Sequence, residues 1–205
     1  MNSDLHALSA STARTRPLTF GKRPGVNEVV SFLKNEHGGP LDMTLGFLLA
    51  QDDDFIERSP EVLQWLFPLD TASVNQPQAP VLTPGELKVL SEQAHEGNAL
   101  AFSRMLRFYG LTASAHGRVH PAANWDERMV KWVPNSSQHS QNLTRVLRSL
   151  TLQGEARRAN ALLEFLTGLF ADKLCPADRL AQRNHWVQAV RQPTADGLAD
   201  CSLGC

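Results

Sequence analysis

The chain has 205 residues, of which 42% are hydrophobic and 20% are charged, as in ordinary globular proteins. Its net charge of −1 gives no bulk attraction to nucleic acid or to anionic membranes. No apolar run reaches the about 18 residues of a membrane span, and the N-terminus lacks the apolar centre of a secretory signal. Three cysteines without a framework spacing indicate a reducing compartment. We therefore expect a soluble, cytoplasmic protein without a transmembrane segment.

The N-terminal part of the chain predicts a tail followed by two short helices. Residues 1–24 have no hydrophobic periodicity and are expected to form a disordered tail. A first helix is predicted over residues 25–37, with Asn27 as its N-cap. A short apolar helix is predicted over residues 43–50, with Asp42 as its N-cap.

The next segment, residues 62–69, has the sequence VLQWLFPL and is called the plug below. Its apolar side chains would cover every side of a short helix, so it should be buried all round, and Pro68 should end it. Residues 70–82 contain two prolines and predict a loop. Thr83 then begins a helix with a clear signature, because a proline follows it and Glu86 completes a capping box.

Longer amphipathic helices are predicted in the second half. One ends at Gly110, and residues 111–121 are the one plausible β-hairpin, turning at Gly117. Asn124 is predicted to cap the following helix. Three more helices carry apolar stripes, and the short connection at Gly154 predicts that two of them pack as an antiparallel pair.

The fold class predicted from these elements is all-α. Strand-type alternation is almost absent, and no internal repeat of 30–45 residues is recognisable. We expect a single multi-helix bundle domain over residues 25–192. Residues 193–205 are expected to form a disordered C-terminal tail. The oligomeric state is not indicated.

Charge is unevenly distributed along the chain. Residues 1–103 carry 7 basic and 13 acidic residues, whereas residues 104–158 carry 9 basic and 3 acidic residues. Two interpretations are open. In the first, the acidic and basic regions face each other or simply lie on the solvated surface. In the second, the basic segment forms a groove for an anionic partner such as nucleic acid.

Two arginine pairs stand out within the basic segment. Arg104 and Arg107, like Arg145 and Arg148, are spaced i, i+3 on predicted helices. Each pair can therefore present two guanidinium groups side by side. If the helices are neighbours, four guanidinium groups would converge on a carboxylate or phosphate. The alternative is that each arginine pairs with an acid of the N-terminal half.

No catalytic or metal-binding constellation is indicated. The acidic residues 52–54 and Glu57 lack the loop of an EF-hand, and they are typical of a solvated helix start favoured by the helix dipole. His116 and His120 have the i, i+4 spacing of metal ligands on a helix, but Gly117 argues against a helix there. We therefore expect no catalytic residue, no metal and no cofactor.

A series of motifs runs in order through the middle of the chain. They are Asp54-Phe55-Ile56, the plug, Ala79-Pro80-Val81-Leu82-Thr83, Met105-Leu106-Arg107-Phe108-Tyr109-Gly110-Leu111, Ala123-Asn124-Trp125 with Arg128, and Thr144-Arg145-Val146-Leu147-Arg148-Ser149-Leu150. Together they resemble the conserved domain of the opioid growth factor receptor family, from about residue 47 to residue 169. Asn142 stands where that family usually has an arginine, so ligand recognition at this position can differ.

The resemblance implies a receptor-like domain that binds an enkephalin-type peptide. It also implies relatives that in animals are nuclear or associated with the nuclear envelope. Animal members carry C-terminal repeats that this sequence lacks, so a stand-alone domain of the microbial type is expected.

The resemblance therefore implies non-catalytic binding of a small peptide or a protein partner. In this hypothesis aromatic side chains wall a groove for apolar peptide side chains, and arginines at its edge hold a terminal carboxylate. The candidate ligand-binding residues are Trp65, Phe67, Trp125, Arg104, Arg107, Arg145 and Arg148. The alternatives are a binder of nucleic acid or an anionic metabolite through residues 104–158, and an enzyme whose residues meet only in the folded chain.

Overall fold

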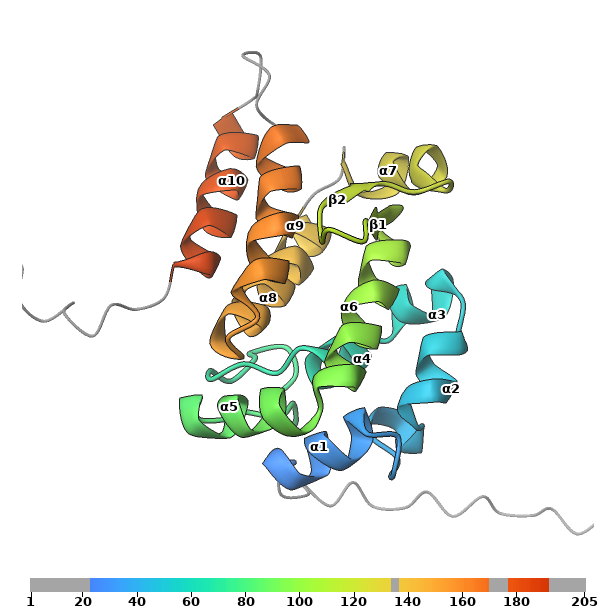
Figure 1. The fold of residues 1–205 in the computed structure, drawn as a ribbon, viewed down its shortest axis with the longest axis vertical. Coiled ribbons are helices and arrows are strands. Elements are labelled where there is room, and N and C mark those ends of the chain that lie inside the picture. Colours follow the sequence, from blue (N-terminus) through green and yellow to red (C-terminus); the bar gives the residue numbers. More distant parts are fainter. Residues whose placement is uncertain (1–22, 134–136, 170–176, 192–205) are drawn as a thin grey trace, which may run out of the picture.

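The computed structural model describes residues 23–133, 137–169 and 177–191, which are almost entirely helical (Figure 1). The elements are α1 (Val26–Leu33), the 3-10 helix η1 (Pro40–Asp42), α2 (Leu45–Ala50), α3 (Asp53–Arg58), α4 (Pro60–Leu66), α5 (Pro84–Gln93), α6 (His95–Phe108), β1 (Leu111–Ala113), β2 (Val119–Pro121), α7 (Trp125–Trp132), α8 (Ser137–Leu152), α9 (Ala156–Leu169) and α10 (Ala177–Val190). The all-α prediction is confirmed. Nearly all of the predicted N-terminal tail, the predicted C-terminal tail and the three cysteines lie outside the described residues.

The two predicted N-caps near the start of the chain are wrong. Helix α1 begins after Gly25 instead of Asn27, because the Gly25 backbone N–H donates to a carboxylate oxygen of Glu28 at 3.1 Å. Helix α2 begins after Thr44, whose hydroxyl accepts a backbone N–H of the first turn. Asp42 lies in η1 with a φ of 55°, and this left-handed backbone is incompatible with the extended conformation of an N-cap.

The later local predictions hold, with one exception. Thr83 and Glu86 form the predicted capping box of α5. Strands β1 and β2 pair antiparallel as a hairpin, and Gly117 takes a φ of 82° between them. The exception is Asn124, which precedes α7 but does not cap it. Its side-chain amide instead donates to the carbonyl oxygen of Arg107 at 3.2 Å.

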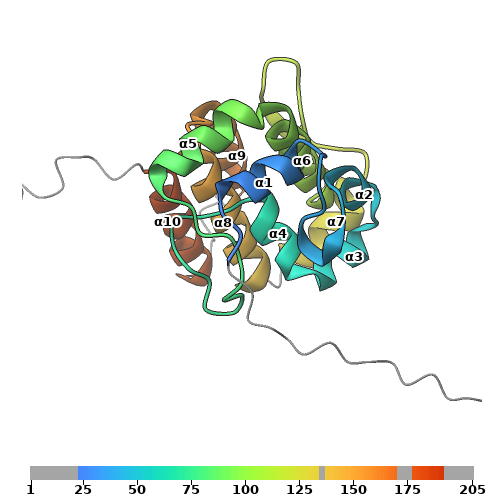
Figure 2. The ribbon, with the colours of Figure 1, turned by 90° about the horizontal axis from the view of Figure 1, so that it is seen from below.

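Helices α8, α9 and α10 pack together on one side of the molecule, and α6 runs between them and the α2–α3 side (Figure 1). Gly154 ends α8 with a φ of 79° and lets α9 turn back along it, which confirms the predicted antiparallel pair. Seen from below, α1 and α5 cross the end of this arrangement, with α4 near its centre (Figure 2).

The plug lies at the centre of the hydrophobic core, as its composition predicts. Val62, Leu66 and Phe67 are each at most 1% exposed. Trp65 is only partly buried, and its ring packs edge-on against Phe32 of α1 with a centroid distance of 5.5 Å. The same core extends from α1 to α10. The helix α4 is therefore held from several sides, and the residues that follow it are fixed in place.

Candidate functional site

A polar hollow of about 980 Å³ opens beside the plug, between the loop after it, α8 and α10. Its volume suits a small ligand or a short peptide. Seven carboxamides and two arginines dominate the lining, and no Asp or Glu from the described part of the chain belongs to it. The carboxamides and arginines are Gln64, Asn75, Gln76, Gln138, Gln141, Asn142, Gln182, Arg145 and Arg148.

Helix α8 forms one wall of this hollow, and its side chains donate hydrogen bonds to the backbone that follows α4. Arg145 donates from Nη1 to the carbonyl oxygen of Phe67 at 3.0 Å, and the buried Ser149 donates to that of Pro68 at 2.8 Å. The carbonyl groups at the end of a helix need such partners because the helix supplies none. The segment Thr144–Leu150 and the plug, which both carry the family resemblance, therefore contact each other directly.

Arg145 and Arg148 share a face of α8 but not an electrostatic environment. Arg148 Nη2 lies 3.4 Å from Oδ2 of Asp70, the first residue of the loop after the plug. Arg145 has no carboxylate within ion-pair distance among the described residues. Burial lowers the pKa of Arg145 to about 10, because the charged guanidinium loses water there. An anion in the hollow would relieve that cost.

Gln64 is a second unusual group in the same wall. It belongs to the plug, is 8% exposed and lines the hollow. Within the described residues its Oε1 has no hydrogen-bond partner. A buried amide oxygen without a donor is unfavourable unless a ligand or water supplies one. Sequence reasoning missed Gln64, although a glutamine inside an otherwise apolar run was the available signal.

Arg104 and Arg107, the other predicted arginine pair, contact a different part of the chain. Arg104 Nη1 lies 2.8 Å from Oδ1 of Asp53, and its Nη2 donates to the carbonyl oxygen of Gln51 at 3.0 Å. Arg107 donates to the carbonyl oxygen of Leu49 at 3.4 Å. Burial lowers the pKa of Arg104, and the carboxylate opposes that shift. Neither arginine lines the hollow, so the two pairs do not converge there.

Asp53 is bound from a second side as well. Its Oδ2 lies 3.4 Å from Nε of Arg128, whose guanidinium also stacks over the ring of Phe108 at 4.6 Å. The acidic residues lie at a helix start, as predicted, and Asp52 is the N-cap of α3. Asp53 differs from the prediction of a solvated acid, because its carboxylate forms ion pairs with Arg104 and Arg128.

The side chains of the three aromatic candidates do not line the polar hollow. Phe67 is 1% exposed in the core, and Trp65 packs on α1. Trp125 packs edge-on against Trp132 and Phe165, with centroid distances of 5.9 and 5.6 Å. None of the three lines the hollow. The structure therefore does not form the hypothesised groove in which aromatic walls meet Arg145 and Arg148.

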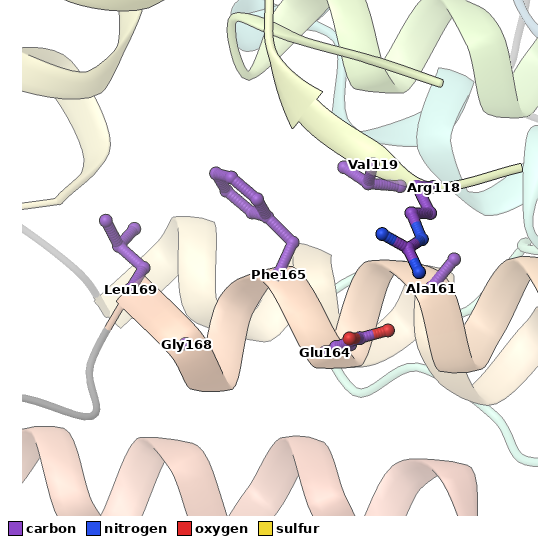
Figure 3. Close-up of a pocket in the computed structure, with 7 residues that line it drawn as sticks. All are labelled: Arg118, Val119, Ala161, Glu164, Phe165, Gly168 and Leu169. Atoms are coloured by element: carbon purple, nitrogen blue, oxygen red, sulfur yellow. The ribbon is translucent and has the colours of Figure 1, made fainter. Parts of the chain in front are cut away.

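A smaller hollow of about 320 Å³ lies between the β2 side of the hairpin and α9. Figure 3 shows Phe165 and Glu164 of α9 below Val119 and Arg118. None of the buried, unpartnered polar atoms in the described ranges belongs to this hollow. Nothing comparable to the Arg145–Gln64 wall marks it, so the polar hollow is the candidate site.

Two other properties concern metals and membranes. Within the described ranges, no group of three or more His, Cys, Asp or Glu side chains could hold a metal ion. Among the helices of the described residues, none is long and apolar enough to cross a bilayer.

The fold and the site define a mainly helical domain with a polar, ligand-sized hollow beside a buried apolar plug. Residues 31–196 match the model of the opioid growth factor receptor conserved region, so the chain belongs to the opioid growth factor receptor family. No solved structure matches the chain significantly.

Three relatives, each named opioid growth factor receptor, agree with this assignment. The Rattus norvegicus protein is 32% identical over 174 residues, which cover 79% of this chain and 29% of the relative. The Mus musculus protein is 32% identical over 146 residues, or 67% of this chain and 22% of the relative. The Homo sapiens protein is 31% identical over 145 residues, or 67% and 21%. The chain thus spans less than a third of the length of these relatives.

Proposed function

We propose that this chain is a non-catalytic binding domain that holds a short peptide, or a short segment of a partner protein, in the polar hollow. Its relatives are named as receptors, which supports a ligand-binding role. Because the match spans only 29% of the Rattus norvegicus relative, the receptor activity of a whole relative is itself a proposal here. We likewise propose a role in signalling and an association with membranes, both of which rest on the family alone, and a cytoplasmic location.

The observation that carries the proposal is the state of Arg145. Its guanidinium is half-buried, lines a hollow and has a backbone carbonyl as its partner, with no acid of the described chain beside it. A cation that has lost part of its water without gaining a counterion is unfavourable, and a bound anion would offset that cost. A peptide offers such an anion in its terminal or side-chain carboxylate, together with backbone groups that suit the surrounding carboxamides.

Binding without catalysis is supported by the composition of the lining. The described residues place no carboxylate and no thiol in it, and His185 is its one imidazole. General acid–base and nucleophilic mechanisms commonly rely on such groups, arranged in hydrogen-bonded sets. Arginines and neutral amides instead provide charge and hydrogen bonds for recognition.

Calorimetric titration of the full chain with an enkephalin pentapeptide and with other short peptides tests the proposal. We expect binding by the wild type and weakening of at least about tenfold in Arg145→Gln, since charge-assisted hydrogen bonds are lost. Arg157→Gln is the matched control, because it removes the same charge from an exposed site on α9 outside the hollow. Failure of every peptide to bind the wild type would sink the proposal.

Binding of nucleic acid or an anionic metabolite through residues 104–158 is the second candidate. Four arginines of this segment lie within 4.0 Å of a carboxylate: Arg104, Arg128, Arg148 and Arg158. Much of the positive charge is therefore neutralised locally, which favours the first interpretation of the charge distribution. Titration with a single-stranded RNA at increasing salt distinguishes the candidates, since phosphate-dominated binding weakens steeply with salt.

A further inference from the structure

Two groups in the wall of the polar hollow, the half-buried guanidinium of Arg145 and the buried amide of Gln64, lack partners of opposite kinds. Arg145 lacks an acid within ion-pair distance in the described chain and can donate several N–H groups to an anionic acceptor. Gln64 lines the same hollow, and its Oε1 is buried and has no donor in the described chain, so a ligand reaches this oxygen once the side-chain amide turns toward the hollow. A ligand that satisfies both groups must carry an anionic acceptor and an N–H donor within one small fragment.

We infer that the hollow binds the C-terminal residue of a peptide, with its free carboxylate on Arg145 and its backbone N–H on Oε1 of Gln64. This inference rests on the proposed function and specifies which end of the peptide is recognised. The carboxylate and the last amide N–H are attached to the same α-carbon, so a single residue brings both groups together. A planar carboxylate also matches the fork of N–H donors on a guanidinium.

Other anions satisfy these two groups less completely. A phosphodiester or a simple carboxylate brings oxygen acceptors for Arg145 but no donor for Gln64, which would stay unsatisfied. A free amino acid brings a positive ammonium group beside its carboxylate, and like charges near a half-buried guanidinium repel. The neutral amide of a peptide C-terminus avoids both problems.

The remaining lining suits a peptide backbone without selecting a sequence. Gln138, Gln141 and Asn142 of α8 face the hollow together with Asn75 and Gln76 of the loop. A carboxamide offers both donors and acceptors, so it can pair with the alternating N–H and C=O groups of an extended chain. The free carboxylate is then the main requirement, and the identity of the side chains matters less.

Arg145 is assigned to the carboxylate because Arg148 already has an acid. Arg148 is paired with Asp70 at 3.4 Å, whereas the protein partner of Arg145 is the carbonyl oxygen of Phe67. A ligand carboxylate can join Arg145 without displacing a negatively charged side chain of the protein.

Two pools of N-acetylated random tetrapeptides test the inference on the full chain. The pools differ in one group, a free C-terminal carboxylate in the first and a carboxamide in the second. Peptides retained by the protein through gel filtration are quantified by mass spectrometry. We expect the acid pool to be retained at least about tenfold better than the amide pool by the wild type and by Arg157→Gln. Arg145→Gln should retain both pools equally poorly.

Gln64→Met separates a binding role from a purely structural one. The apolar side chain has a similar volume and removes a buried, unsatisfied oxygen, so the melting temperature of the free protein should stay equal or rise. Retention of the acid pool should nevertheless fall several-fold. A residue with only a structural role would lose stability and binding together. Unchanged retention by this variant would overturn the assignment of Gln64.

The outcomes with wild-type protein distinguish the inference from the proposed function. Equal retention of both pools would show peptide binding without recognition of the terminus, which overturns the inference and leaves the proposed function standing. No retention of either pool counts against both. A mixture of free amino acids should not compete with the acid pool, and strong competition would point to an amino-acid ligand and overturn the assignment to peptide termini.

Discussion

Arg104 on α6 and Arg145 on α8 each occupy the first position of an i, i+3 arginine pair, yet their surroundings differ. Arg104 is 4% exposed and lies 2.8 Å from a carboxylate oxygen of Asp53. Arg145 is half-buried, donates to a backbone carbonyl and lines a hollow. A guanidinium that the fold neutralises contributes to holding helices together, whereas one that the fold leaves without an acid is available to a ligand.

The two arginines differ in their surroundings because the helices α6 and α8 pack against different segments. Helix α6 faces the start of α3, where Asp53 lies one residue after the N-cap. Helix α8 faces the residues that follow α4, where the chain offers carbonyl oxygens. The same two-arginine pattern therefore acquires different roles from contacts that lie more than 50 positions away in the sequence.

The largest expected effect is on Arg104. Arg104→Met should lower the free energy of unfolding by about 3 kcal/mol, because a buried ion pair is broken and Asp53 loses a partner. Arg145→Met should change it by less than about 1 kcal/mol, since one hydrogen bond is lost while a desolvated charge is removed. Urea unfolding followed by circular dichroism measures both. Equal losses in the two variants would show that Arg145 is a structural residue like Arg104.

A smaller loss is expected at Ser149, which shares α8 with Arg145 but faces the core. Ser149 is 0% exposed, donates to the carbonyl oxygen of Pro68 and accepts a hydrogen bond from Gln153 at 2.9 Å. Ser149→Ala should cost about 1–2 kcal/mol in urea unfolding, because buried polar groups lose their partner. Peptide binding per folded molecule should be unchanged.

Ser103→Ala on α6 is the control for that loss. Ser103 is exposed, so its removal should change the free energy of unfolding by less than about 0.5 kcal/mol. A weakened peptide affinity in folded Ser149→Ala would instead place the whole face of α8 in the binding site.

Local features of this fold could be predicted from the sequence because their causes are local. The capping box of Thr83, the turn at Gly117 and the break at Gly154 each depend on residues within a few positions. The burial of the plug followed from its density of apolar residues. The caps at Asn27 and Asp42 were mispredicted because the competing interactions, of Glu28 and of a left-handed backbone, left no distinctive signal.

The candidate site was predicted only in part. Arg145 and Arg148 were identified from their spacing, but the sequence could not show that Asp70 neutralises one and that no acid of the described chain reaches the other. The aromatic wall was misplaced because large rings such as those of Trp65 and Phe67 are used mainly in packing. The sequence could not identify Gln64 as a site residue, because whether its side-chain oxygen has a hydrogen-bond partner depends on tertiary contacts.

His139 of α8 lies where the two regions meet. Tyr109, the residue that follows α6, donates to the carbonyl oxygen of His139 at 3.5 Å, and the His139 side chain is 12% exposed. Burial lowers the pKa of His139, and the carboxylate of Glu57 at 3.8 Å opposes that shift only partly. The unfolded chain therefore binds this proton more readily than the folded chain does.

Acidification below the unfolded histidine pKa of about 6.5 should consequently lower the stability, until the folded side chain is protonated as well. The wild type should lose stability between about pH 7 and pH 5, and His139→Gln should lose less. Urea unfolding at several pH values measures the slope, with His185→Gln on α10 as the control. A wild type that gains stability in this range, unlike His139→Gln, would mean that Glu57 dominates over burial.

Removing the acid that pairs with Arg148 should make this arginine resemble Arg145 at little cost in stability. Asp70→Asn removes the acid from a pair whose side chains are 26% and 24% exposed, so the free energy of unfolding should change by less than about 1 kcal/mol. The hollow would then contain two arginines without an acid, and affinity for acid-ended peptides should rise a few-fold in calorimetry. Adding Arg148→Gln to Asp70→Asn should cancel the gain. An unchanged affinity in Asp70→Asn would mean that the ligand carboxylate reaches Arg145 alone, which sharpens the distinction between the two arginines of α8.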